Sequence, residues 1–285
     1  MEIIGATINT SESETIIEIL EKRDKERLLK LADYQIKLGA EMLDLNAGDR
    51  IKTEKDDIVW MMKTIQREFE VPISIDTPDA EVIRSGLDCH ENSYGRPLVN
   101  SVSGERERLD NILPLVEEYD VPVVGLLMDE EGIPDTAEGR LEIADMIIAE
   151  MKEYHIPDED IYLDPLIFPV AVDGDNGKIS LETVSLIKEK YPEVKTICGL
   201  NNISHGLPAR EMINGTYIAM LAATGMDSFL VEMTEVSSAV LKTAEMLLGN
   251  DRMCMDFLSA YREGVLDIYQ DGAEEAIVED TKEEG

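Results

Sequence analysis

The chain has 285 residues, of which 44% are hydrophobic, and its 61 acidic and 26 basic residues give a formal net charge of −35 at pH 7. A surface this acidic repels the phosphates of DNA and RNA, which excludes nucleic-acid binding. It would also suit a high-salt cytosol. No apolar run approaches the roughly 20 residues of a membrane span, and the N-terminus reads as a strand without a secretion signal. We expect a cytoplasmic protein with no membrane partner.

The three cysteines and three histidines are scattered, and they form no CxxC, HxxxH or HExxH pattern. Disulfide frameworks and structural zinc sites need closely spaced pairs of such residues. Only Cys89 and His90 are adjacent, and they lack companion ligands, so we interpret them as a helix end and a loop. The sequence therefore predicts neither a disulfide framework nor a metal site.

Short apolar runs that end in polar residues alternate along the chain with helical patterns. We expect strands at residues 3–9, 42–46, 71–76, 97–101, 121–128, 161–165, from 196, and at 228–233. Helical patterns cover residues 28–36, 58–69, 105–119, 136–154, 210–223 and 238–248. Alternation of short strands with helices is typical of parallel βα units, and about eight such units favour a closed barrel over an open sheet. The predicted fold is an α/β (β/α)8 TIM barrel.

The pattern changes beyond Gly249. Residues 253–269 could form one more helix, whereas residues 271–285 are acidic and poor in large apolar side chains, a composition typical of disorder. We therefore divide the chain into a barrel at residues 1–252 and a C-terminal helix with a partly disordered acidic tail at residues 253–285.

The C-terminal ends of the expected strands carry carboxylates and carboxamides. They are Asn9, Asp44, Asn46, Asp76, Asn100, Asp164, Asn202 and Glu232. In a barrel of parallel strands these ends face the ligand. Capping of the following helices can explain any one of them, because Asp and Asn are good N-caps. Helix capping explains the whole set of strand-end residues less well, because Ser or Thr would serve equally well as caps, yet nearly all of these residues are Asp or Asn.

These residue types narrow the class of ligand. A phosphate site would need cations and backbone N–H groups, whereas the loop with Gly174 and Gly177 carries two acids and also fails the EF-hand calcium pattern. A carboxylate accepts two parallel N–H bonds from a guanidine-like edge, and an Asn side chain both donates and accepts. Pterins have such an edge. The chain has no GxSxG or similar nucleophile motif, and transfer at a pterin nitrogen needs no catalytic metal.

With these residues, the chain resembles the methyltetrahydrofolate:corrinoid methyltransferases of the pterin-binding barrel family, from about residue 3 to about residue 256. The matching stretches are GATIN at 5–9, LDLNAG at 43–48, IDT at 75–77, VNS at 99–101, GIP at 132–134, LDPL at 163–166 and GLNNIS at 199–204. Each stretch is weak alone, but together, in this order and at strand ends, they are fairly specific.

The resemblance implies roles for individual residues. Asp76, Asn100 and Asp164 would hold the pterin edge, and Asn202 would be the catalytic residue near N5, the atom that carries the methyl group. Further folate contacts are implied at the floor and in the loop after the seventh strand, by Asp44, Asn46, Gly199, Ser204, His205 and Arg210.

The resemblance also implies the reaction and its partners. The chain would move a methyl group, in either direction, between a corrinoid and N5 of tetrahydrofolate, with tetrahydrofolate or methyltetrahydrofolate as substrate. A separate corrinoid protein would bring the corrinoid to the barrel mouth, and the enzyme would be a homodimer.

Three residues, at two places in the chain, depart from the family pattern. After Gly5 the family often has an acid and an arginine, where this chain has Ala6 and Thr7, and after Ser204 it often has an amide, where this chain has His205. A lone loop histidine is more often structural or exposed than catalytic.

Three other functions stay open at this point. A transferase similar to dihydropteroate synthase would need basic residues late in the barrel, but no Lys lies between Glu211 and Leu241. The chain could also be a non-catalytic module that binds pterin or a corrinoid protein. Finally, it could be an unrelated barrel whose polar strand ends are only helix caps.

Overall fold

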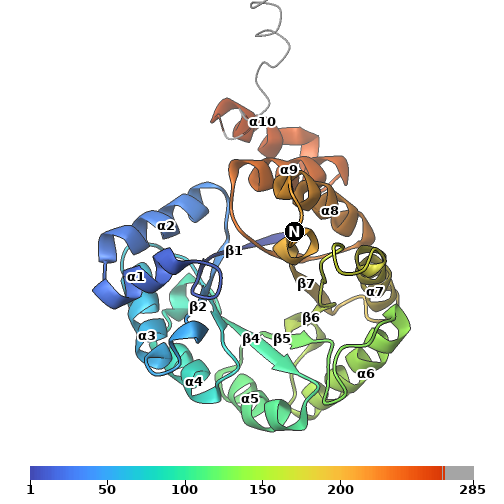
Figure 1. Ribbon diagram of the computed structural model, residues 1–285, viewed down its shortest axis with the longest axis horizontal. Coiled ribbons are helices and arrows are strands. Elements are labelled where there is room, and N and C mark those ends of the chain that lie inside the picture. Colours follow the sequence, from blue (N-terminus) through green and yellow to red (C-terminus); the bar gives the residue numbers. More distant parts are fainter. Residues whose placement is uncertain (265, 267–285) are drawn as a thin grey trace, which may run out of the picture.

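Eight parallel strands close into a barrel in the computed structural model, which describes residues 1–264 and 266 (Figure 1). Each strand pairs with the next along the chain, and β8 pairs with β1. The strands are β1 (Glu2–Asn9), β2 (Met42–Asn46), β3 (Ile73–Asp76), β4 (Leu98–Ser103), β5 (Val123–Leu126), β6 (Ile161–Asp164), β7 (Lys195–Gly199) and β8 (Ser228–Val231). The predicted TIM barrel is confirmed.

An outer ring of helices covers the strands (Figure 1). The α-helices are α1 (Glu14–Lys22), α2 (Lys25–Lys37), α3 (Glu54–Ile65), α4 (Ala80–Cys89), α5 (Arg106–Tyr119), α6 (Ala137–Glu153), α7 (Asn176–Lys190), α8 (Arg210–Thr224), α9 (Glu235–Leu247) and α10 (Met255–Arg262). The last of these lies outside the ring, beside α9. No helix in the described part of the chain is long and apolar enough to cross a membrane.

Three local predictions differ from the structure. Helices α1, α4 and α7 are absent from the predicted helical patterns, although the buried Ile16, Ile19 and Leu20 of α1 have helical spacing. Gly177 lies in the first turn of α7 rather than in a loop. The helix expected at residues 253–269 is shorter, because Met253 and Cys254 have positive φ angles and α10 ends at Arg262. The predicted disorder at residues 271–285 falls outside the described residues.

The interior of the barrel is built in layers by alternate residues of the strands, since successive strand residues point to opposite faces. An apolar middle layer consists of Ile4, Met42, Leu98, Val124, Tyr162 and Ile197. Two residues further along the same strands come Ala6, Asp44, Asn100, Leu126, Asp164 and Gly199. A period of two therefore places the polar side chains of Asp44, Asn100 and Asp164 in the layer directly above the apolar one, at the C-terminal end of the barrel.

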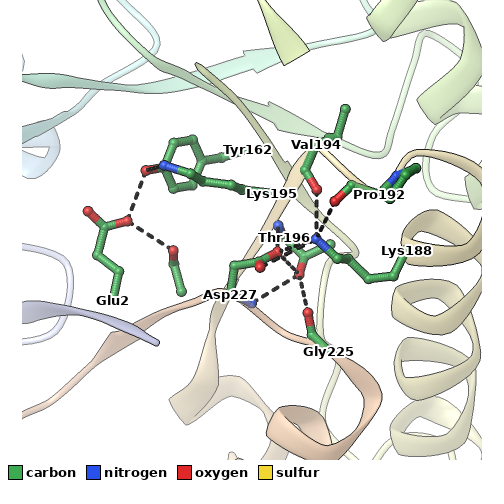
Figure 2. Close-up of polar contacts among 10 residues, drawn as sticks. Glu2, Tyr162, Lys188, Pro192, Val194, Lys195, Thr196, Gly225 and Asp227 are labelled. Atoms are coloured by element: carbon green, nitrogen blue, oxygen red, sulfur yellow. Dashed lines mark hydrogen bonds and ion pairs between the residues drawn. The ribbon is translucent and has the colours of Figure 1, made fainter. Parts of the chain in front are cut away.

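The N-terminal end of the barrel holds a polar cluster around Glu2 (Figure 2). Its carboxylate accepts hydrogen bonds from the Tyr162 hydroxyl at 2.9 Å and from Ser228 Oγ at 3.0 Å. Lys195 Nζ donates in turn to the Tyr162 hydroxyl at 2.7 Å. The cluster links β1, β6, β7 and β8, so its contribution is to the closure of the barrel.

A second cluster at this end surrounds Asp227 (Figure 2). The carboxylate accepts from the Thr196 amide at 2.8 Å, from Thr196 Oγ1 at 3.1 Å and from Lys188 Nζ at 3.0 Å. Lys188 Nζ also donates to the Val194 carbonyl at 3.0 Å. Asp227 thus joins β8 to β7 and α7, at the end of the barrel where polar residues serve stability rather than catalysis.

We therefore expect Asp227→Ala to destabilise the fold by about 1–3 kcal/mol, because it leaves the Thr196 amide without its acceptor and the Lys188 ammonium without its carboxylate partner. Urea unfolding should show a lower midpoint with an unchanged slope. The exposed Glu189 on the same helix as Lys188 gives the control variant Glu189→Ala, which removes an equal charge. Equal midpoints for the two variants would contradict the structural role of Asp227.

Candidate functional site

A cavity of about 190 Å³ opens at the C-terminal ends of the strands. It is lined by Ala6, Asn9, Glu12, Asp44, Asp76, Asn100, Gly199, Asn201, Asn202, Leu230 and Glu232. Four of these residues are acids, and no Lys or Arg is among the described residues that line the cavity. The cavity therefore favours a ligand that presents several N–H donors and disfavours an anion.

Asp44 is the most deeply buried acid of this cavity, with 2% of its surface exposed. Its Oδ1 accepts hydrogen bonds from Ser74 Oγ at 2.5 Å and from Asn100 Nδ2 at 3.1 Å. Burial raises the pKa of Asp44 well above its usual range, and the nearby Asp76 charge raises it further. Asn100 is thereby held in place beside a carboxylate in the floor of the cavity.

Asp76 lies at the end of the neighbouring strand β3. Burial raises its pKa to about 6, and the charges of Glu54 and Glu12 raise it, whereas a hydrogen bond from Asn46 lowers it. That bond joins Asn46 Nδ2 to Asp76 Oδ2 at 3.0 Å. At neutral pH, Asp76 is therefore an ionised, partly desolvated acceptor.

The amide of Asn46 is oriented by its own contacts. Its Oδ1 accepts from the Gly48 amide at 3.0 Å and from Thr10 Oγ1 at 3.2 Å, which leaves the Nδ2 group to face Asp76. Asn46 does not itself line the cavity. It contacts a residue that does, so its predicted place beside the floor matches the geometry, while its contact with a folate stays a prediction.

Asp164 ends β6 and is 8% exposed. Its Oδ1 accepts from the Leu166 amide at 2.7 Å. Burial raises the pKa of Asp164 to about 6, and the Leu166 amide, the Arg140 charge and the Gly199 amide oppose that rise. Asp164 does not itself line the cavity, whereas Gly199, whose amide contacts the Asp164 carboxylate, does.

Asn202 lies at the exposed rim of the cavity, in the short 3-10 helix Leu200–Ser204 that follows β7. A Cβ atom on Gly199 would come within 3.3 Å of Asn202 Nδ2, so the glycine gives this side chain room. The amide of Asn202 is consequently accessible both from the cavity and from solvent.

The three other predicted loop residues do not line this cavity. Ser204 is buried below the loop, where it donates to the Asn201 carbonyl at 3.3 Å and accepts from Arg210 Nε at 3.1 Å. His205 is exposed, and Arg210 lines an adjacent cavity of about 240 Å³. Ser204 and Arg210 support the loop that carries Asn202, and folate contacts by these residues stay predictions.

Sequence reasoning assigned no role to four polar residues that line the cavity, namely Asn9, Glu12, Asn201 and Glu232. Asn201 connects the two cavities, since it lines both and donates to Glu232 Oε2 at 3.4 Å. Glu232 was noted as a strand end without an assigned role. Glu12 follows β1 in a loop and carries no motif that separates it from the other acids of the chain. The position of Ala6, where the family often has an acid, does line the cavity.

The buried acids make stability depend on pH. The folded-state pKa of Asp76, about 6, exceeds its ordinary value of 3.8, so its favourable contribution is complete below pH 3.8 and is lost as the pH rises through 6. We expect Asp76→Asn to stabilise the fold by about 1–2 kcal/mol at pH 8 and by much less near pH 4.5. Urea unfolding at both pH values measures this. The exposed-residue variant Glu189→Gln should show no such difference, and a gain for Asp76→Asn that is equal at both pH values would contradict the assignment.

Among characterised proteins, the chain is 32% identical over 268 residues to a methylcorrinoid:tetrahydrofolate methyltransferase of Eubacterium limosum, a match that covers 93% of this chain and 97% of that protein. It is 28% identical over 246 residues to a methionine synthase of Mycobacterium tuberculosis, which covers 82% of this chain and 20% of that longer protein.

Solved structures share the fold at low sequence identity. A dihydropteroate synthase of Coxiella burnetii in complex with pteroic acid has a TM-score of 0.65 and 18% identity, with 88% of this chain and 94% of that chain covered. A Yersinia pestis dihydropteroate synthase with a pterin–sulfa conjugate has a TM-score of 0.67 and 17% identity, with 87% and 93% covered. The model of the pterin binding enzyme family matches residues 5–232, and the chain belongs to this family.

Proposed function

We propose that this protein transfers a methyl group between a methylcorrinoid and N5 of tetrahydrofolate. The observation that carries the proposal is the cavity at the barrel mouth, which combines four acids and several amides with Asn202 at its rim, and in which no described lining residue is basic. The near full-length similarity to an enzyme named for this reaction supports it.

The floor of the cavity suits the edge of a pterin ring. Asp76 is ionised at neutral pH and offers oxygen acceptors to neighbouring N–H groups, while Asn100 can both donate and accept. Asp44, which holds Asn100, needs no direct contact with the ligand. A bound pterin would also relieve part of the cost of burying these carboxyl groups, because its N–H donors replace lost water.

Asn202 is the residue that we assign to the reacting atom. When N5 is the leaving group it must carry positive charge, and the side-chain oxygen of Asn202 can accept a hydrogen bond from the protonated nitrogen. In the opposite direction Asn202 holds the ring so that the free lone pair of N5 is in line with the methyl group. The corrinoid supplies the cobalt atom that gives or takes the methyl group.

The proposal includes a corrinoid protein as partner and a cytoplasmic location. Asn202 is exposed at the mouth, so a cofactor that stays on another protein can approach the methyl group without entering the barrel. A dihydropteroate-synthase-like reaction is less compatible with this geometry. Among the described residues, the mouth cavity has no basic side chain, and Arg210 is bonded to Ser204 and Asn201 in the adjacent loop.

We expect Asn202→Ala to reduce methyl transfer on the order of a hundredfold, because the reacting nitrogen loses both its hydrogen bond and its alignment. The assay is the anaerobic visible spectrum of methylcobalamin with tetrahydrofolate and the enzyme. Calorimetric titration should show that tetrahydrofolate binding is largely retained. Asn250→Ala, an exposed change at the far end of the barrel, is the control.

Two results would contradict this role for Asn202. One is a loss of tetrahydrofolate binding with intact turnover of the folate that still binds. The other is a wild-type rate for Asn202→Ala. If the wild-type enzyme binds tetrahydrofolate but does not demethylate free methylcobalamin, the assay is repeated with methylated corrinoid protein as donor.

We also propose that two copies of the chain pair through helix α8. Its outer face exposes Met212 and Met220, with 70% and 46% of their surfaces accessible, and beyond Glu211 the helix has no charged residue. Thr216, Ala219 and Ala223 are exposed between and beyond these methionines at helical spacing. Because the chain carries a net charge of −35, two copies repel least where an uncharged face meets its own symmetry mate.

Met220→Glu should convert the dimer to a monomer, because it places two like charges near the two-fold axis of an apolar contact. Sedimentation velocity at several protein concentrations measures the mass. Ile51→Glu is the matched control, since Ile51 is 83% exposed and lies in the loop after β2. A monomeric wild-type protein would overturn the proposed dimer, and a dimeric Met220→Glu variant would place the interface away from this part of α8.

A further inference from the structure

Arg140 on α6 is among the largest fully buried side chains of the protein, with 2% of its surface exposed. Burying a guanidinium is costly unless its donors are satisfied. Each hydrogen bond that it makes with the described residues goes to a backbone carbonyl rather than to a carboxylate: Nε to Pro134 at 3.0 Å, and Nη1 to Pro165 at 2.6 Å and to Leu166 at 3.0 Å. An arginine placed in this way orders backbone.

The backbone that it orders is the turn directly after Asp164. Leu166 has a φ angle of 58°, which a leucine adopts only at a cost. In this conformation the Leu166 amide points back and donates to Asp164 Oδ1 at 2.7 Å. Arg140 Nη1 binds the carbonyls of the two residues between which the turn is made. These two hydrogen bonds of Arg140 Nη1 therefore stabilise the turn conformation that fixes the Asp164 carboxylate.

Arg140 joins this turn to a second loop. Its Nε binds the carbonyl of Pro134, in the connection between β5 and α6, and its guanidinium lies 5.8 Å from the centre of the Phe168 ring. The loop that follows β5 and the loop that follows β6 are thus held by one side chain. Displacement of the guanidinium would release both loops together.

Among the charged and titratable groups that act on Asp164, Arg140 carries the opposite charge. Cys198 faces it from β7, and Tyr217 on α8 and Asp135 face the arginine. Burial raises the pKa of Cys198 and of Tyr217, so both are neutral at pH 7. Burial lowers the pKa of Arg140, and the charges of Asp164 and then Asp135 oppose that change, so the guanidinium stays cationic.

We propose that Arg140 is a positioning residue for pterin binding, which holds the turn after β6 and compensates the charge of Asp164, without touching the pterin. The inference rests on the proposed function in one respect, namely that Asp164 contributes to the pterin site. It adds to that function a residue outside the cavity that controls the pH range over which pterin binds.

The pH dependence has a defined sign. Arg140 favours the ionised form of Asp164, so its removal raises the pKa of this carboxyl from about 6. Binding of N–H donors needs the carboxylate, and affinity is therefore lost as the pH falls through that pKa. In Arg140→Gln the loss begins at higher pH. A displacement of one pH unit makes the affinity at pH 6 about fivefold weaker than in the wild-type protein.

The experiment is anaerobic calorimetric titration of tetrahydrofolate into the full-length protein from pH 5.5 to pH 8.5. The acid limb of the affinity profile is the pH range in which affinity falls as the pH is lowered. In Arg140→Gln this limb should lie at a pH about one unit or more higher than in the wild type. Arg140→Lys keeps the charge but not the planar fork, so its limb should stay near that of the wild type, with weaker binding at every pH. Arg106→Gln is the matched control, because Arg106, at the start of α5, is exposed and pairs with Glu150 on α6, the helix that carries Arg140.

Asp76 also titrates near pH 6, so the effect must be assigned to Asp164. In an Asp164→Asn background the Arg140→Gln change should no longer move the acid limb. The inference is overturned if Arg140→Gln loses tetrahydrofolate affinity at the same acidic pH as the wild type. It is also overturned if Arg140→Gln shifts that pH equally in the Asp164→Asn background. If Arg140→Gln does not fold, Arg140→Lys decides, since wild-type affinity at pH 8 in that variant contradicts the positioning role. A wild-type protein that binds no tetrahydrofolate contradicts the proposed function instead.

Discussion

Burial of carboxyl groups at one end of an apolar barrel is the constraint on which the site depends. Strand pairing sets Ser74 beside Asp44, and Asn100 beside Asp76, directly above the apolar middle layer. Each buried acid receives hydrogen bonds from neighbouring strands or turns, yet the pKa values stay raised because these bonds do not replace all the lost hydration. A ligand with several N–H donors supplies the missing hydrogen bonds. The free-energy cost of burying these carboxyl groups in the free protein therefore favours binding of that kind of ligand.

The two ends of the barrel use polar residues in different ways. At the N-terminal end, Glu2 and Asp227 have basic or hydroxyl partners and join strands to one another (Figure 2). At the C-terminal end the acids that line the cavity have amides and hydroxyls beside them, and no basic lining residue among the described part of the chain. Satisfied charges stabilise the closure of the barrel, whereas unsatisfied acceptors remain available for a ligand. This asymmetry, rather than the fold, identifies the functional end.

The strands and the floor of the site could be predicted from sequence, because both follow from a period of two with a polar residue at each strand end. The loops could not. The 3-10 helix after β7 turns Ser204 inward and leaves His205 in solvent, which linear spacing does not reveal. Glu12 lies in the loop after β1 and lines the cavity, although no motif in the sequence marks it. Arg140 looks like any helical arginine in the sequence, and only its contacts with two loops distinguish it.

The departure from the family at Ala6 and Thr7 falls on a register shift of β1, between Gly5 and Ile8. Buried Gln35 explains the geometry there, because its Oε1 accepts from the Thr7 amide at 3.0 Å and occupies space that a Cβ on Gly5 would need, at 2.6 Å. Bulges of this kind re-aim side chains next to functional sites. The bulge presents the methyl group of Ala6 to the cavity, which Glu12 from the loop after β1 also lines. The departure at Ala6 therefore lies in the wall beside β1, while Asp44, Asp76 and Asn100 line the floor that the strand ends form.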